Sequence, residues 1–379
     1  MALLTNTFLA TLFPIIAWLG PVIKSAGTVD YAEMRACGFT HTLNIYHNWD
    51  DALTDLDRAA RNDIGIYVYT PRMFNDTDKA VSVLSQKRGL AGYLLSDEPG
   101  PDDLPRLADL AGRINDIDPE HPCYVNLHPY YEEAQMRQVG ISNYDGYIRA
   151  ASSIPLPVIS FDYYSVTRHG LRPTWFQNMT SIRNESLRTG RPFWGFILSV
   201  PHSIYNRIDA ATMRLQAYVN LAYGAQGLVY FTYMTPEAYD VNDFHDAPIG
   251  ANGKKTANYA LVQAMNRELK TVTPLFLGAK VNRIQHIASS FFFAEKLRTK
   301  LDNISSVKAS SSEGILVSEF TKAGHQYAAF VNKDYTSEAT LTLASRNNMP
   351  KRITKKLTEE PLQKEYTLPA GDILIIRLN

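Results

Sequence analysis

The sequence predicts a TIM-type (β/α)8 barrel, an α/β fold, that carries a C-terminal antiparallel β-sandwich. From residue 13 to about 236, short apolar runs alternate with longer amphipathic stretches, which is typical of repeated βα units. From about residue 286, strand-like runs with period-2 alternation are separated by Gly or Asn turns. The length of 379 residues fits one domain of about 250 residues and a second of about 100. We therefore expect a catalytic barrel within 1–275 and a β-sandwich over 286–379 that contributes no catalytic residue.

The barrel strands are expected in eight runs rich in β-branched and aromatic residues. In chain order these runs are 13–20, 39–46, 65–72, 90–99, 122–129, 157–164, 192–201 and 227–236. Asp residues lead the amphipathic stretches between them, where N-caps belong, and Gly38 and Gly65 close the first two as C-caps. Residues 254–270 predict a closing helix. An open doubly wound sheet is the competing architecture, but no G-x-G-x-x-G motif follows the first strand and no P-loop occurs.

Charge and composition argue against several classes of partner. Lys plus Arg and Asp plus Glu number 38 each, so no net field attracts the chain to nucleic acid or to an anionic membrane. The N-terminal apolar segment lacks a basic n-region and is interrupted by Pro14 and Pro21, so we expect a first strand rather than a signal peptide or a membrane span. Localisation stays open, and periplasmic or secreted export is favoured if a signal peptide has been removed. Cys37 and Cys123 are expected to be buried thiols.

The C-terminal ends of the strands are where a barrel of this kind carries its reactive groups. Acids, amides, imidazoles and aromatic side chains gather at these positions. Such a set suits a carbohydrate, because amides and imidazoles bond hydroxyl groups and aromatic faces stack on pyranose rings. The expected substrate ligands are Trp18, Asn44, Tyr46, His47, Asn126, His128, Tyr164, His202 and Tyr233, with His245 from the loop after the eighth strand.

The motif GYLLSDEPG at 92–100 is the sharpest catalytic signal. Pro99 ends the fourth strand directly after Glu98, because proline cannot donate to a sheet ladder. Two aspartates of the following helix are available for capping, which leaves Glu98 free for catalysis. Since adjacent strand residues point to opposite sides, only one of Asp97 and Glu98 is expected to face the barrel axis.

The S-D-E-P segment, together with an aromatic-rich eighth strand, resembles the retaining TIM-barrel glycosidases of clan A, in which N-E-P at this position supplies the general acid/base. The stretch from FWGFILSVPHS to RLQAYVNLAYGAQGLVYFTYMTPEAYD also resembles gut-bacterial glycoside hydrolases related to family 42 β-galactosidases. Together these features cover roughly residues 13–250. The resemblance implies an acid/base role for Glu98 and a carbohydrate substrate.

The same resemblance implies a nucleophilic glutamate at the end of strand seven, but the seventh run, PFWGFILSVP, has no carboxylate. Three replacements remain open. Asp162, in FDYYS at the end of strand six, is a candidate nucleophile or a base for water. Glu237, in the loop after strand eight, is the second candidate. In the third, the Asp97–Glu98 pair and a tyrosine on strand six serve a substrate-assisted reaction in which an N-acetyl group of the substrate attacks.

The sequence thus predicts a glycoside hydrolase with Glu98 as proton donor and Asp162 or Asp97 as the partner carboxylate. The alternatives are a catalytically inactive carbohydrate-binding barrel and a substrate-assisted enzyme of the N-acetylhexosaminidase type. No cofactor is expected, and no metal site, because the His and Cys residues lack ligand spacings such as H-E-x-x-H. A serine hydrolase built on Ser199 and His202 is disfavoured, because no G-x-S-x-G turn occurs.

Overall fold

The computed structural model describes residues 12–21, 30–237, 243–297 and 300–379, without the side chains of 290–296. The chain divides into two compact units. The first comprises the residues up to Ile208 together with Gly227–Asn266, and the second comprises Asp209–Gln226 together with Arg267–Asn379. The domain limits of 1–275 and 286–379 stay a prediction. Residues 1–11, on which part of the argument about a signal peptide was based, lie outside the described residues.

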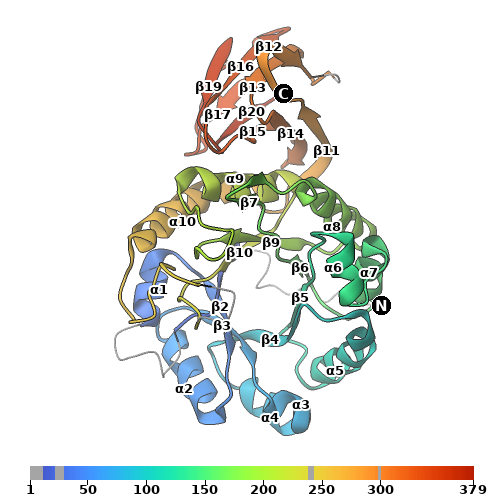
Figure 1. Ribbon diagram of the computed structural model, residues 1–379, viewed down its shortest axis with the longest axis vertical. Coiled ribbons are helices and arrows are strands. Elements are labelled where there is room, and N and C mark those ends of the chain that lie inside the picture. Colours follow the sequence, from blue (N-terminus) through green and yellow to red (C-terminus); the bar gives the residue numbers. More distant parts are fainter. Residues whose placement is uncertain (1–11, 22–29, 238–242, 298–299) are drawn as a thin grey trace. The chain divides into compact units, whose positions relative to one another are not determined.

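The first unit contains the predicted closed barrel of eight parallel strands, which confirms the fold class (Figure 1). Neighbours around the barrel follow the order β1, β10, β9, β6, β5, β4, β3, β2, and back to β1. The strands are β1 (Ile15–Trp18), β2 (His41–Ile45), β3 (Gly65–Tyr69), β4 (Leu90–Asp97), β5 (Cys123–Leu127), β6 (Ile159–Phe161), β9 (Phe193–Leu198) and β10 (Gly227–Phe231). Each falls inside one of the eight predicted runs.

Helices and short segments connect these strands. They are α1 (Tyr31–Cys37), α2 (Trp49–Ala60), α3 (Arg72–Asn75), α4 (Thr77–Leu84), η1 (Pro101–Asp103), α5 (Leu104–Ile117), α6 (Glu133–Gln138), α7 (Tyr144–Ala151), α8 (Trp175–Thr189), α9 (Ala210–Tyr223) and α10 (Ala257–Phe276). A two-stranded hairpin of β7 (Val166–Thr167) and β8 (Gly170–Leu171) lies between β6 and α8. None of the helices in the described part of the chain is long and apolar enough to cross a membrane.

The predicted caps hold at α1 and fail at α2. Asp30 accepts the N–H of Ala32 at the start of α1, and Gly38 ends that helix with a left-handed φ of 104°. At α2 the N-cap is Asn48, with the predicted aspartates in the first turn. Gly65 is not a C-cap but the first residue of β3, where a Cβ atom would lie 2.7 Å from the ring of His41. Close packing of neighbouring strands, rather than helix termination, therefore requires glycine there.

Large aromatic side chains fill the interior of the barrel. The rings of Tyr67, Tyr124 and Trp194 lie 5.7 to 6.0 Å apart, and Trp18 packs on Phe196 at 6.1 Å. All five residues are almost completely buried. The barrel is thus a packed core rather than a pore. Both cysteines are buried thiols, as predicted.

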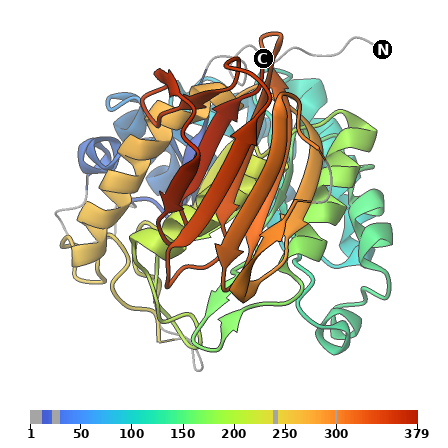
Figure 2. The same ribbon diagram turned by 90° about the horizontal axis from the view of Figure 1, so that it is seen from above.

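The second unit contains a β-sandwich, as predicted, whose strands run side by side in Figure 2. Its sheets have the orders β11-β14-β15-β20-β17-β18 and β12-β13-β16-β19. The strands are β11 (Lys280–Ile287), β12 (Ser290–Lys296), β13 (Ile304–Ser311), β14 (Ile315–Lys322), β15 (His325–Asn332), β16 (Ala339–Ser345), β17 (Lys351–Ile353), β18 (Glu359–Pro361), β19 (Glu365–Leu368) and β20 (Ile373–Arg377). One apolar core holds side chains of both sheets, and α9 joins this unit, where Ser318 donates to the carbonyl of Ala222 at 2.6 Å.

We predict that replacing two glycines of the first unit by alanine changes the stability of the fold in opposite directions. A Cβ at Gly92, in β4, would lie 2.4 Å from the carbonyl oxygen of Pro122 and 2.5 Å from the buried ring of Tyr67. We expect Gly92→Ala to destabilise the fold by about 2 kcal/mol or more, because neither neighbour has room to move. Gly112, inside α5, has nothing within 4 Å, and Gly112→Ala is expected to stabilise by up to about 1 kcal/mol. Urea unfolding of both variants checks the pair, and equal effects would contradict the strand packing described here.

Candidate active site

Three carboxylates lie together at the C-terminal ends of β4 and β6, on either side of β5. Asp97 is the last residue of β4, Glu98 follows it, and Asp162 comes directly after β6. Between them, in β5, Asn126 donates through Nδ2 to Oδ1 of Asp97 at 3.0 Å and to Oδ1 of Asp162 at 2.9 Å. The amide is buried and Asp97 pairs with Asn126 in register. One side chain of the middle strand therefore ties together the acids of both neighbours.

The backbone of Glu98 overturns the expectation that only one of Asp97 and Glu98 faces the site. Glu98 has a φ of 47°, in the left-handed region that non-glycine residues rarely adopt. Its N–H donates to the carbonyl of Asn126 at 2.8 Å, which continues the β4–β5 pairing past the last strand residue. The left-handed turn breaks the alternation of side chains, and the carboxylates of Asp97, Glu98 and Asp162 all interact.

Glu98 and Asp162 influence each other electrostatically, because the charge of Asp162 raises the pKa of Glu98. Asp162 accepts from Nδ2 of Asn126 at 2.9 Å, and the side chains of Asn126 and Tyr164 both lower its pKa. Of the two carboxyl groups, Glu98 therefore favours the protonated form and Asp162 the ionised form.

Burial raises the pKa of every member of this group, and charge repulsion raises the pKa of Asp97 and Glu98 further. Desolvation raises the pKa of Asp97 and of Glu98, and the charge of Asp162 raises both further. Desolvation also raises the pKa of Asp162, against the hydrogen bonds from Asn126 and Tyr164. Asp97 is exposed and Glu98 retains 38% of its side-chain exposure, so water screens part of the repulsion. The arrangement keeps at least one carboxyl group protonated well above the usual range.

His128, the residue after β5, lies on the other side of Glu98. Its Nδ1 is 3.5 Å from Oε2 of Glu98. Burial lowers the pKa of His128, so this contact joins neutral groups rather than an ion pair. Tyr147 holds the segment in place: its hydroxyl accepts the N–H of His128 at 3.3 Å and donates to the carbonyl of Pro99 at 2.9 Å.

Aromatic rings continue the site from strand six toward strands seven and eight. The ring of Tyr164 lies 5.8 Å from that of Tyr205 and 5.5 Å from that of Phe231. His202 packs at 4.6 Å from Phe244, and burial lowers its pKa. Its Nδ1 hydrogen-bonds to the carbonyl of Val200. These rings offer apolar faces next to the carboxylates, which suits a sugar ring.

The predicted site residues therefore divide into two sets. Asp97, Glu98, Asn126, His128, Asp162 and Tyr164 contact one another, and His202 packs on Tyr164 with ring centroids 6.4 Å apart. Among the described residues, none of the remaining six makes a hydrogen bond or ring contact to the three carboxylates. These six are Trp18, Asn44, Tyr46, His47, Tyr233 and His245.

Internal contacts explain most of the second set. Asn44 donates to the hydroxyl of Tyr46 at 2.9 Å and to the carbonyl of Pro21 at 3.1 Å, and it accepts the N–H of Gly20, so it fixes the backbone of these two residues after β1. Both Asn44 and Tyr46 are buried. Tyr233 is fully buried and packs edge-on against Phe39 at 5.4 Å, directly after α1.

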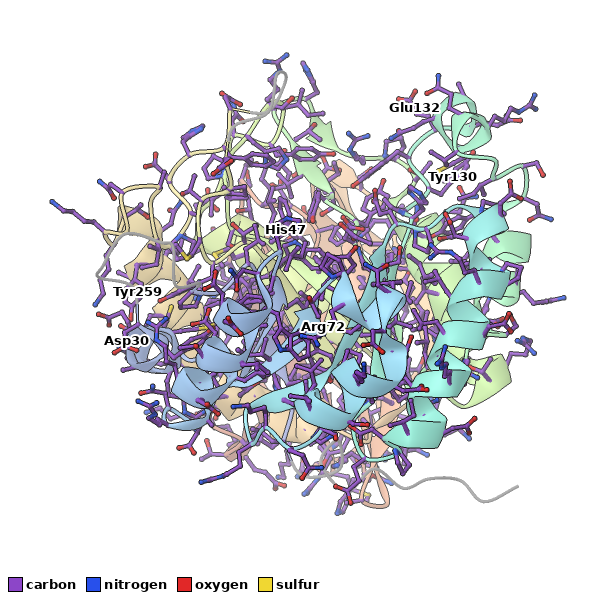
Figure 3. The ribbon with its side chains drawn as sticks, turned by 90° about the horizontal axis from the view of Figure 1, so that it is seen from below. Asp30, His47, Arg72, Tyr130, Glu132 and Tyr259 are labelled. Atoms are coloured by element: carbon purple, nitrogen blue, oxygen red, sulfur yellow. The ribbon has the colours of Figure 1, made fainter. Side chains whose placement is uncertain are left out.

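His47 and His245 differ from these residues because they are exposed, in the loops after β2 and β10. Figure 3 labels His47, and it also labels Tyr130 and Glu132 in the loop after β5. Glu237, considered above as a second acid, is exposed as well. Across the residues whose placement the structure describes, no group of three His, Cys, Asp or Glu side chains is arranged to hold a metal ion.

Three residues that adjoin the site were not identified from the sequence. They are Tyr131, Arg172 and Tyr205. The hydroxyl of Tyr131 accepts the N–H of Tyr164 at 3.2 Å, and Nη2 of Arg172 donates to the hydroxyl of Tyr205 at 2.7 Å. All three lie on loops rather than at strand ends, where periodicity gives no sign of direction. The concentration of tyrosines in HPYYEE and FDYYS was the available signal.

The fold is shared with solved structures of low sequence identity. A β-galactosidase from Bacillus circulans sp. alkalophilus is similar over 98% of this chain and 100% of its own, with 10% identity and a TM-score of 0.63. A family 39 glycoside hydrolase from Bacteroides cellulosilyticus WH2 covers 97% and 81%, with 9% identity and a TM-score of 0.53. An alpha-amylase from H. orenii covers 96% and 99%, with 9% identity and a TM-score of 0.54. No family profile matches the chain, and no curated protein matches it by sequence.

We predict that removing one negative charge from the carboxylate cluster stabilises the folded chain. A carboxyl group whose pKa is raised by folding loses stability as the pH rises above the range in which the unfolded group titrates. Asp97→Asn keeps an oxygen that can accept from Asn126 but removes the charge, so we expect the Tm at pH 8 to rise by roughly 2 °C. The gain is expected to shrink as the pH falls toward 4, where the wild-type carboxyl groups become protonated. The matched control is Asp102→Asn, at an exposed site in the segment after β4, for which no such pH-dependent gain is expected.

Proposed function

We propose that this chain is a glycoside hydrolase in which Glu98 is the general acid. The observation that carries the proposal is the cluster of Asp97, Glu98 and Asp162 at the strand ends, in which Asn126 donates to Asp162 at 2.9 Å and the charge of Asp162 raises the pKa of Glu98. Cleavage of a glycosidic bond requires one carboxyl group that is still protonated near working pH and a second that is ionised. The unequal environments of Glu98 and Asp162 supply both.

Glu98 is the better proton donor of the two for two reasons. Desolvation and the neighbouring charges of Asp162 and Asp97 all raise its pKa, whereas donors partly compensate the charge of Asp162. Glu98 also keeps accessible surface, so a leaving-group oxygen can reach its carboxyl group. Neutral His128 beside it adds no charge that would favour the ionised form of Glu98.

Asp162 is proposed as the nucleophile. Inverting enzymes hold their two carboxyl groups roughly 6.5–9.5 Å apart to accommodate a water molecule, whereas retaining enzymes hold them about 5 Å apart. We propose retention, because the single amide group of Asn126 holds Asp97 and Asp162 close together and Glu98 directly follows Asp97. The competing substrate-assisted reaction rests on Asp97, because Asn126 directs its other N–H to that carboxylate.

The similar structures support this proposal through their fold. This chain shares its fold with a β-galactosidase, a family 39 glycoside hydrolase and an alpha-amylase. A fold of this type hosts many activities, so the likeness supports glycosidase chemistry by analogy and the carboxylates carry the specific argument. The resemblance to clan A enzymes and to relatives of family 42 is part of the same proposal, as is a carbohydrate substrate held by His128, Tyr164 and His202.

Glu98→Gln tests the role of the general acid. On substrates with poor leaving groups we expect kcat/KM to fall about 10³-fold, because the departing oxygen is no longer protonated. On nitrophenyl glycosides the loss is expected to be much smaller, since that leaving group departs without a proton. Steady-state kinetics on a panel of both substrate types measures the difference, with Glu237→Gln at an exposed loop position as control.

Equal losses on both substrate types would contradict acid catalysis by Glu98. Sugar binding without turnover of any substrate in the wild type would instead identify a catalytically inactive carbohydrate-binding barrel.

Asp162→Asn tests the nucleophile. We expect turnover to fall by about 10³-fold or more while sugar binding persists, because the amide cannot form the glycosyl ester. Added azide is expected to restore turnover of a nitrophenyl glycoside and to yield the glycosyl azide, which NMR identifies. Retained activity in Asp162→Asn, together with lost activity of Asp97→Asn on an N-acetylated glycoside, would show that the substrate-assisted reaction operates instead.

A further inference from the structure

Arg172 occupies a fixed position on the rim beside the proposed catalytic pair. It follows the β7–β8 hairpin, which belongs to the connection between β6 and α8, and its N–H donates to the carbonyl of Ser165 at 2.8 Å. The hairpin is tied to the loop after β9, because the N–H of Arg168 donates to the carbonyl of Ile204 at 2.8 Å. The backbone that carries Arg172 is therefore held from both sides.

Among the described residues, the guanidinium group has aromatic partners but no ionic one. It lies 4.2 Å from the ring centroid of Tyr131 and 5.4 Å from that of Tyr205, and Nη2 donates to the Tyr205 hydroxyl at 2.7 Å. Nε is buried without a hydrogen-bond partner. Nη1 has no partner among the described residues either, and it is not buried. No carboxylate in the described part of the chain forms an ion pair with Arg172.

The same tyrosines link Arg172 to the carboxylates. The Tyr131 hydroxyl accepts the backbone N–H of Tyr164 at 3.2 Å, and the side chain of Tyr164 lowers the pKa of Asp162. Tyr205 packs on the ring of Tyr164, and its pKa responds to the positive charge of Arg172 and to the negative charge of Asp162. One aromatic side chain therefore separates a ligand bound at the proposed catalytic pair from the guanidinium group.

We propose that Arg172 binds the carboxylate of an acidic sugar, so that the substrate contains a uronic acid. This inference rests on the proposed carbohydrate substrate and names its chemical class. The planar fork of a guanidinium matches the planar carboxylate group of a uronic acid and can bind it through two parallel hydrogen bonds. Near three acidic side chains, a uronate is repelled unless a cation compensates its charge, and Arg172 supplies that cation at an accessible nitrogen.

Binding of four methyl glycosides tests the inference without requiring turnover. The probes are the β-D-glucuronide and β-D-galacturonide and their neutral counterparts, the β-D-glucoside and β-D-galactoside, titrated calorimetrically at low salt and millimolar concentration. We expect the wild type to bind one of the uronides about tenfold more tightly than its neutral counterpart, with a preference that weakens as salt is added. Arg172→Met, which keeps an apolar stem against Tyr131, is expected to abolish that preference. Arg168→Met, which removes the same charge from an exposed site on the hairpin, is expected to retain it.

Four results would overturn the inference. These are the absence of uronide binding, equal binding of the acidic and neutral probes, a preference that survives in Arg172→Met, and a loss of affinity for both probe types accompanied by a lower Tm, which would identify a structural role. Tighter binding of a 6-sulfated galactoside than of the uronides would also overturn it in favour of a sulfate ester. A uronide preference without hydrolysis of nitrophenyl uronides would refute the proposed hydrolase but leave this inference standing.

Discussion

The carboxamide of Asn126 is the contact on which the arrangement of the acidic groups depends, because its two N–H groups are donated to carboxylates of two different strands. Its carbonyl oxygen lies 3.5 Å from the hydroxyl of Ser160, which is in turn 2.6 Å from that of Tyr124. Tyr124 belongs to the aromatic core of the barrel and packs on Trp194. The orientation of the acids is therefore transmitted from the packed interior rather than set by loops, which is how a site keeps its geometry within a fraction of an ångström.

This arrangement stores free energy in the folded state. Three carboxyl groups with raised pKa values lie together, and Glu98 occupies a left-handed backbone conformation that its side chain disfavours. Neither feature improves the stability of a barrel, and a strand end with a neutral residue would avoid both. Strain and repulsion that persist in a fold are characteristic of sites at which function opposes stability. The two features coincide at a single residue, Glu98, which strengthens its assignment as the proton donor.

The fold and the acidic residues were predictable for the same reason. In a closed barrel the strand ends share one rim, so alternating βα units sufficed to place Asp97, Glu98, Asn126 and Asp162 together. The orientation of individual side chains was not predictable. The left-handed φ of Glu98 cancels the alternation rule, and the buried network that engages Asn44 depends on contacts 23 and 24 residues distant in sequence. Arg172 lies on a loop, and no periodic pattern in the sequence predicts the path of that loop.

The spacing of the strands accounts for the absence of an acid on the seventh strand. Neighbouring strands lie about 4.8 Å apart, so β4 and β6, which flank β5, present side chains that meet over the central residue Asn126. A partner on β9 would stand one strand farther away. In the proposed reaction Glu98 gives its proton to the leaving-group oxygen as the glycosidic bond breaks. Asp162, held by the amide of Asn126, attacks the anomeric carbon from the opposite face and forms the glycosyl ester, so the residue between the two strands positions the nucleophile.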